Sequence, residues 1–123
     1  MIKLLNILSE IVVQKDPTLK KITDYVRGGS KGDLDLFGTP IQSLPDGLKV
    51  GGSLYLGGTP IQSLPPGLKV GGYLNLKHTP IQSLSPDLEV EGDLFLGGTL
   101  ISKRYTKKEI RKMVPGVKGN IYL

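Results

Sequence analysis

The sequence predicts an α/β repeat solenoid in which short coils of 20 residues stack along one axis. Three consecutive segments, 38–57, 58–77 and 78–97, have the same length and nearly the same sequence. Each contains two Leu residues separated by a polar or aromatic residue, a period-two pattern that is typical of a short half-buried strand. Each also has Pro and Gly at repeated positions, which is typical of turns. Repeats of this length bury their apolar residues only by stacking, so the copies are expected to share one continuous core.

Residues 1–31 are predicted to form an N-terminal helical cap that covers the first coil. Asp16-Pro17 supplies the N-cap and first-turn proline of a helix that should run to about Val26, before Gly28-Gly29. An earlier helix is predicted over 2–13, because apolar residues recur there at helical spacing: Leu4, Leu5, Leu8, Ile11 and Val12. This earlier helix belongs to the cap or, as the alternative, is a docking peptide for a partner.

Residues 32–101 are predicted to be the coils, with a single parallel sheet of about five short strands. Proline occurs at positions 40, 60 and 80, and again at 45 and 65. Because proline cannot donate a ladder hydrogen bond, the side of each coil away from the Leu-x-Leu strand is expected to be extended or turn-like rather than sheet.

Residues 102–123 are predicted to close the same structural domain with a capping helix and a last strand. The segment 117–123 has the register of 50–56, but Val117 follows Val90 by 27 residues, so the last coil carries a seven-residue insertion. Thr106-Lys-Lys-Glu109 is a capping box that should open a helix through about Val114. The strand that follows is expected to have an open edge that could pair with another chain, including a second copy.

The repeat resembles the leucine-rich repeat, in the short form found in bacterial and phage proteins and in the LPX-type effectors of bacterial pathogens. The family pattern LxLxxNxLxxLP is matched by Leu54-Tyr-Leu56-Gly-Gly-Thr59-Pro-Ile61-Gln-Ser-Leu64-Pro65. The resemblance covers 32–101 strongly and the termini weakly. Thr replaces the family's Asn at 39, 59, 79 and 99, so any side-chain ladder in the turns is expected to be weaker. A single-sheet β-solenoid of another kind is the structural alternative.

The composition argues against most enzymes. The chain of 123 residues has no Cys and one His, which excludes thiolate metal sites and makes a conventional catalytic triad improbable. Asp33 with Asp35, or Glu91 with Asp93, form carboxylate pairs, but no apolar pocket is implied that would raise a pKa. His78 replaces a turn Gly and is interpreted as a solvated turn residue. We therefore expect no enzyme activity, no metal and no cofactor. Neither a signal peptide nor a membrane span is recognised, so a cytoplasmic location is expected, with a virion as the alternative.

The exposed side of the predicted sheet is the candidate binding surface. The first two full copies differ at four positions, and three of these alternate along the strand, away from the Leu core. Aromatic and polar residues gather there, which is typical of interfaces, although aromatics also pack across strands. The candidate protein-binding residues are Asp33, Asp35, Phe37, Ser53, Tyr55, Tyr73, Asn75, Lys77, Asp93, Phe95 and Tyr122.

Charge is divided along the chain. Residues 32–98 contain three basic and seven acidic residues, whereas 99–123 contain seven basic residues and one acidic residue. A basic helix can contact phosphates or an acidic partner, although such a face is more often simply solvated. The candidate residues for such contacts are Arg104, Lys107, Lys108, Arg111 and Lys112.

These observations favour a non-enzymatic protein-binding module. The resemblance implies that it could be a phage-encoded binder or inhibitor of a host or defence protein. One alternative is a structural or self-assembling component that uses the last strand. A second alternative is an accessory protein that binds nucleic acid through the basic helix.

Overall fold

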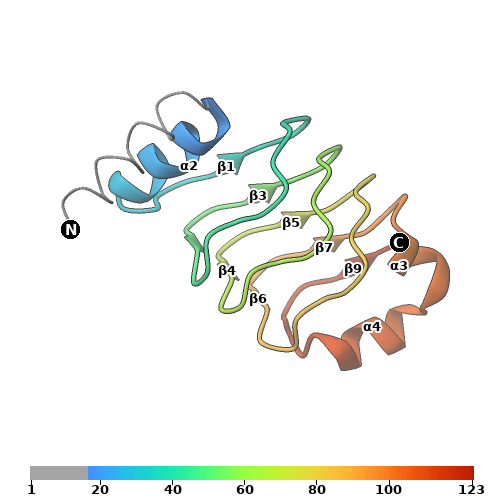
Figure 1. Cartoon of the computed structure of the whole chain (residues 1–123). Coiled ribbons are helices and arrows are strands. Elements are labelled where there is room, and N and C mark those ends of the chain that lie inside the picture. The colour runs from blue at the N-terminus through green and yellow to red at the C-terminus, as the bar shows by residue number, and fades with distance from the viewer. Residues whose placement is uncertain (1–16) are drawn as a thin grey trace, which may run out of the picture.

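A computed structural model describes residues 17–123, and it shows a β-solenoid with two parallel sheets (Figure 1). The larger sheet contains five strands: β1 (Leu34–Asp35), β3 (Leu54–Tyr55), β5 (Leu74–Asn75), β7 (Leu94–Phe95) and β9 (Ile121–Tyr122). The smaller sheet contains four: β2 (Lys49–Val50), β4 (Lys69–Val70), β6 (Glu89–Val90) and β8 (Gly116–Val117). Every coil supplies one short strand to the larger sheet.

The second sheet corrects the prediction of a single sheet. The Lys-Val and Glu-Val pairs of successive coils form a ladder in which the amide of Gly71 donates to the carbonyl of Val50 at 2.7 Å. Pro45 and Pro65 lie in the turns before these strands and remove no donor from the ladder. The prediction wrongly extended the effect of Pro45 and Pro65 to the Lys-Val segments that follow them, which are strands. The remaining side of each coil, which contains the prolines at 40, 60 and 80, has no strand among the described residues, as expected.

The predicted register of the coils is confirmed, including the insertion in the last one. Leu34, Leu54, Leu74 and Leu94 are successive Cα partners, and Ile121 pairs with Leu94 in the same series. In the smaller sheet Val117 pairs with Val90 across the longer connection. The strand leucines of the middle coils are fully buried, so one continuous apolar core runs along the solenoid.

The backbones of neighbouring coils approach closely where Gly recurs. A Cβ on Gly71 would collide with the carbonyl oxygen of Gly51, and a Cβ on Gly92 would lie 2.8 Å from the carbonyl oxygen of Gly72. Real Cβ atoms do not reach such contacts without a shift of the backbone. The repeated Gly pairs are therefore needed for coil stacking as well as for bending the chain.

The Thr residues that recur after β1, β3, β5 and β7 of the larger sheet bond within their own coil. The hydroxyl of Thr59 donates to the carbonyl of Leu56 at 2.7 Å, and those of Thr39, Thr79 and Thr99 make the same bond. Thr59, Thr79 and Thr99 are almost fully buried. The hydroxyls thus stabilise each turn rather than forming a ladder between coils.

Helices lie at both ends of the solenoid (Figure 1). At the N-terminal end, α2 (Pro17–Arg27) agrees with the predicted second helix, and it buries Ile22. The hydroxyl of Tyr25 lies 2.7 Å from the carbonyl oxygen of Gly32 and 2.9 Å from that of Ser30, and it donates its one hydrogen to this pair. It also accepts the amide of Gly51, and these bonds fasten α2 to the first coil. The helix predicted over 2–13 lies outside the described residues.

At the C-terminal end two helices fill the long connection before β8. The predicted capping helix is α4 (Lys107–Met113), and the complete capping box of Thr106 and Glu109 is present. It buries Ile110, which with Val114 extends the core. A further short helix, α3 (Leu100–Arg104), was not predicted; its N-cap Thr99 accepts the amide of Ser102. Across residues 17–123, no helix combines the length and apolar character needed to cross a membrane.

Candidate functional site

The five-stranded sheet brings the predicted face residues together in the expected columns. Asp35, Tyr55, Asn75, Phe95 and Tyr122 are successive partners across the sheet. Their side chains alternate with the buried leucines, and each is exposed or half-buried. Short strands with one apolar face therefore place a row of variable side chains on the outer face of the sheet.

The polar residues that begin these strands bond to the next coil. An Asp33 carboxylate oxygen accepts the amide of Ser53 at 2.7 Å, and the Ser53 hydroxyl accepts the amide of Tyr73 at 2.9 Å. An Asp93 oxygen accepts the amide of Asn120 at 2.8 Å. Ser53 was expected on the exposed face, but it is only 7% exposed. Its hydroxyl is already used in the hydrogen bond to the next coil, so we remove Ser53 from the candidate binding residues.

Two other polar candidates also make structural hydrogen bonds. Asp35 accepts the amide of Phe37, and Asn75 accepts the amide of Lys77, each at 3.0 Å. These bonds between residues two apart are side-chain turns that end the strands. Five of the six polar candidates thus make hydrogen bonds within the fold, and Lys77 is the sixth.

Three aromatic rings and one lysine form a contiguous group, which we call the aromatic cluster: Tyr73, Phe95, Tyr122 and Lys77. The rings of Tyr73 and Phe95 meet edge to face with centroids 5.9 Å apart. Phe95 stacks on Tyr122 at 5.0 Å, and Lys77 Nζ lies 5.3 Å from the Phe95 centroid. Tyr73 is 47% and Tyr122 is 42% exposed, so the cluster has a large accessible surface. The rings hold one another in a fixed arrangement.

Phe37 lies apart from the aromatic cluster, toward the N-terminal end of the same sheet. It is 67% exposed, and its ring lies against Gly57, where a Cβ would be 3.1 Å from two ring atoms. Tyr55 is half-buried on the neighbouring coil. The face is therefore aromatic over much of its length.

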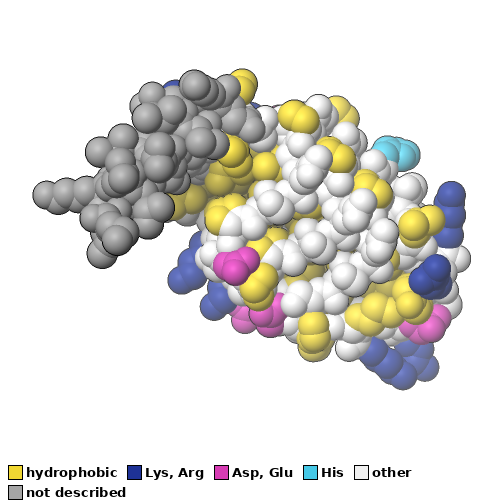
Figure 2. Space-filling view, viewed as in Figure 1, with side chains coloured by type: hydrophobic (Ala, Val, Ile, Leu, Met, Phe, Trp, Pro, Cys, Tyr) yellow, Lys and Arg dark blue, Asp and Glu magenta, His cyan; other side chains and the backbone are white. Residues whose placement is uncertain are grey.

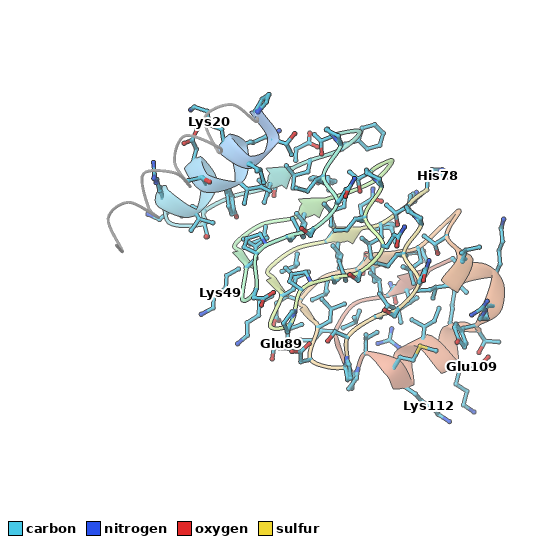
Figure 3. The ribbon with its side chains drawn as sticks, in the orientation of Figure 1. Lys20, Lys49, His78, Glu89, Glu109 and Lys112 are labelled. Carbon is cyan, nitrogen blue, oxygen red and sulfur yellow. The ribbon has the colours of Figure 1, made fainter. Side chains whose placement is uncertain are left out.

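The basic candidates are divided between solvent and structural contacts. Lys107, Lys108 and Lys112 are exposed on α4, and Lys112 points away from the coils (Figure 3). The guanidinium of Arg111 instead donates to the carbonyls of Val117 and Gly119, at 3.0 and 2.7 Å. Arg111 thus fastens α4 to the chain that leads into β9. Its role in the fold was not apparent from the sequence, because the loop that it contacts has no recognisable motif.

Arg104 lies on the other C-terminal helix. It lines a cavity of about 350 Å³ with Gln82, Leu100, Ile101 and Tyr105. None of the exposed lysines of α4 lines this cavity. Lys and Arg side chains gather around the C-terminal helices, whereas the middle of the visible surface is largely uncharged (Figure 2).

The groove between α4 and β9 is a site that sequence reasoning did not define. It has a volume of about 410 Å³ and is lined by Lys107, Lys108, Arg111, Asn120, Ile121 and Tyr122. The signals for it were present separately, as a basic helix and a last strand. Their proximity depends on the path of the long connection, and that path has no counterpart in the other coils.

In the part of the chain that the structure describes, the acidic groups and the single His are not clustered as metal ligands. No group of three or more His, Asp and Glu side chains there is placed to hold a metal ion. His78 is exposed, with φ of 58° at the turn position that other coils fill with Gly. On the smaller sheet Glu89 pairs with Lys69 at 3.3 Å and Glu91 with Lys118 at 3.0 Å.

Comparison with protein-family models, with curated proteins and with solved structures finds no match to this chain.

Proposed function

We propose that the chain is a non-enzymatic protein-binding module whose principal contact surface is the aromatic cluster. The observation that carries this proposal is the set of three mutually packed rings, with Lys77 above Phe95, exposed on a rigid sheet. Aromatic side chains bury about 150–250 Å² each and dominate many interfaces. Because these rings are already ordered by one another, binding would restrict little additional side-chain motion.

The resemblance to short leucine-rich repeats supports the same proposal. Such repeats present variable side chains on a repeated scaffold, and here the scaffold repeats while the aromatic positions differ between coils. We extend the proposal to a phage or bacterial binder, in the host cytoplasm, that occupies a surface of a host or defence protein. This extension follows from the resemblance alone.

The test is a nuclease-treated affinity capture followed by binding measurements on the purified partner. A Tyr73→Ala/Phe95→Ala variant should weaken the measured Kd at least tenfold, because two central aromatic contacts are lost. The matched control is Gln42→Ala/Gln62→Ala, since both Gln residues are exposed on the proline-containing side of the coils. The control should bind within twofold of the native chain, and circular dichroism should show that both variants are folded.

Three results would contradict the proposal. The aromatic and control variants could bind equally, or the captured protein could be lost after nuclease treatment. The third result is a mass that rises with protein concentration in the absence of any partner. Loss with nuclease would favour the nucleic-acid alternative, and self-association would favour the structural one.

A further inference from the structure

The ring of Tyr122 belongs both to the aromatic cluster and to the groove between α4 and β9. One face of this ring stacks on Phe95, with centroids 5.0 Å apart and planes 13° apart. Within residues 17–123 the larger sheet ends at β9, so no further strand there supplies a ring for the other side of Tyr122. Tyr122 lines the groove and is 42% exposed. The stack therefore fixes the ring and leaves its second face to the groove.

The groove is accessible at its side chains, although the middle of β9 is buried. Ile121 is 3% exposed within the core, and α4 packs against β9. Asn120 and Tyr122, on either side of Ile121, are exposed and line the groove. A ligand can therefore reach the Tyr122 ring and the Asn120 side chain without displacing α4.

The α4 side of the groove is cationic. Lys107 and Lys108 line it, both are exposed, and none of the described residues that line it is acidic. The ion pairs between described residues involve neither lysine. Both lie in the first turn of α4, where the helix dipole disfavours positive charge, so they do not stabilise the helix. A further basic residue of the groove, Arg111, is already bonded to the carbonyls of Val117 and Gly119.

A ring face beside two ammonium groups fits a ligand that joins a planar aromatic group to an anion. A nucleobase with its phosphate has this composition, because bases of any kind stack on aromatic side chains while lysines neutralise phosphates. A phosphate has more acceptor oxygens than a carboxylate, which suits two neighbouring ammonium groups. The groove volume of about 410 Å³ is within the range of small-ligand sites.

A second copy of the chain is the competing occupant, because the β1 end of its sheet carries Asp33, Asp35 and the exposed ring of Phe37. Each of these carboxylates already accepts a backbone amide. Residues 1–35, with both carboxylates included, contain six basic and five acidic residues, whereas 99–123 contain seven basic residues and one acidic residue. The N-terminal end therefore has no net negative charge to offer the groove, and a phosphate-bearing ligand fits it better.

We propose that the groove between α4 and β9 binds a nucleobase with its phosphate, either as a free nucleotide or as part of a single strand. The base stacks on the free face of Tyr122, and the ammonium groups of Lys107 and Lys108 donate to the phosphate oxygens. The inference goes beyond the proposed function, since it holds even if the aromatic cluster binds no protein.

The test is an NMR titration of the isotope-labelled full chain at 150 mM salt with adenosine monophosphate and with a 5′-phosphorylated deoxyadenosine trinucleotide. The amide signals of Lys108, Asn120 and Tyr122 should shift to saturation, and the base protons should move upfield because they lie over the ring. Adenosine and inorganic phosphate should each bind at least tenfold more weakly. A trinucleotide that binds at least fivefold tighter than the mononucleotide identifies a strand as the ligand; otherwise the ligand is the free nucleotide.

Two pairs of variants separate stacking from charge. Tyr122→Leu should weaken the Kd at least fivefold, whereas Tyr122→Phe keeps the ring face and should stay within twofold of the native chain. Lys107→Gln/Lys108→Gln should weaken the Kd at least fivefold. Its matched control, Lys103→Gln/Lys112→Gln, removes the same charge outside the groove and should change the Kd by less than twofold. Circular dichroism should show that all four variants are folded.

Several results would overturn the proposal. Equal weakening in both lysine variants, or undiminished binding by Tyr122→Leu, would indicate diffuse attraction, and the absence of any shift with either nucleotide would exclude the site. Tighter binding of a capped tripeptide of Asp, Phe and Asp would indicate a protein segment. Self-association in sedimentation that Lys107→Gln/Lys108→Gln abolishes would indicate a second copy. Tyr73→Ala should leave the nucleotide Kd within twofold while it weakens protein binding by the aromatic cluster, so the two proposals can fail separately.

Discussion

The ring of Phe95 stacks on the ring of Tyr122, with centroids 5.0 Å apart and planes 13° apart, although 27 residues separate them in the sequence. In the other coils, residues that are partners across the larger sheet are 20 apart in the sequence. The last coil is longer, yet its strand pairs in the same register, and this pairing places Tyr122 beside Phe95. The connection that forms the groove beside β9 therefore also completes the aromatic cluster.

We expect this stack to contribute to folding as well as to binding. A double-mutant cycle of Phe95→Ala and Tyr122→Ala should give a coupling of about 1 kcal/mol in the free energy of unfolding, the usual size for a stacked pair. Urea denaturation followed by circular dichroism measures it. A control cycle of Phe37→Ala and Tyr122→Ala, on residues in different coils far along the sheet, should show no coupling. A Phe95–Tyr122 coupling near zero would mean that the rings touch without stabilising each other.

Ser53 offers a test of the bonds between coils. Ser53→Ala removes the acceptor of the Tyr73 amide, and we expect it to lower the free energy of unfolding by about 1–2 kcal/mol. The control is Ser63→Ala, because Ser63 is exposed, and it should change stability by less than about 0.5 kcal/mol. Thermal or urea unfolding of the two variants supplies the comparison. If Ser63→Ala lowered the free energy of unfolding as much as Ser53→Ala, the bond between the Ser53 hydroxyl and the Tyr73 amide would not explain the loss of stability.

The sequence predicts the coil register well because that register depends on short-range periodicity. Apolar residues at fixed spacing, the capping box of Thr106 and Glu109, and the return of Val117 to the register of Val90 are all local patterns. Each is confirmed. The second sheet was missed because the effect of proline was extended too far along the chain. Its strands have two residues each, as those of the larger sheet do, and Leu48-Lys49-Val50 alternates in burial in the same way.

The candidate site was predicted less completely, because exposure and pairing depend on the neighbouring coil. The alternation of apolar and polar residues along the strand places Ser53 on the outer face of the sheet. It does not show that the Ser53 hydroxyl accepts the amide of Tyr73 in the next coil, or that Ser53 is buried. It also does not show that Arg111 turns back to the chain before β9. The columns of aromatic residues were predictable, since stacking at a fixed period decides which side chains become neighbours.

The pKa of Asp87 leads to a prediction about acid. The Ser85 hydroxyl first, and then the Gly67 amide, donate to this carboxylate and hold its pKa below the usual value. A folded-state pKa that is lowered gives stability above the unfolded pKa of about 3.9, and this stability is lost as pH falls through the folded value. Asp87→Asn should therefore lose less stability than the native chain between pH 5 and about 3 in urea titrations. Parallel curves for the two proteins would contradict the assignment.

Replacement of His78 by Gly is predicted to stabilise the fold. Its φ of 58° lies in the left-handed region, and the equivalent Gly38, Gly58 and Gly98 have φ of 69°, 69° and 74°. Because this conformation is unfavourable for a residue with a Cβ, His78→Gly should raise the free energy of unfolding by about 1 kcal/mol. Thermal unfolding should show the midpoint higher by about 3–6 °C. The control is the opposite change, Gly58→Ala, which introduces a Cβ at a φ of 69° and should lower the midpoint of thermal unfolding. A lower midpoint for His78→Gly would show that contacts of the imidazole outweigh the backbone strain.

Arg111 tests whether α4 is held in place by its bonds to the chain before β9. Arg111→Met keeps most of the apolar stem and removes both donors to the carbonyls of Val117 and Gly119. We expect it to lower the free energy of unfolding by about 2 kcal/mol, because two charge-assisted hydrogen bonds are lost. Lys112→Met is the control, since Lys112 lies next in the helix and points into solvent, and it should be nearly neutral.

Arg111→Met should also speed amide exchange at Val117 and Lys118, and this readout distinguishes loss of the clamp from a general loss of charge. The Lys118 amide donates to Val90 in the smaller sheet, so it reports whether β8 stays paired. If exchange there were unchanged while stability fell, α4 would be held mainly by the burial of Ile110 and Val114. The wall of the groove would then depend on the core rather than on Arg111.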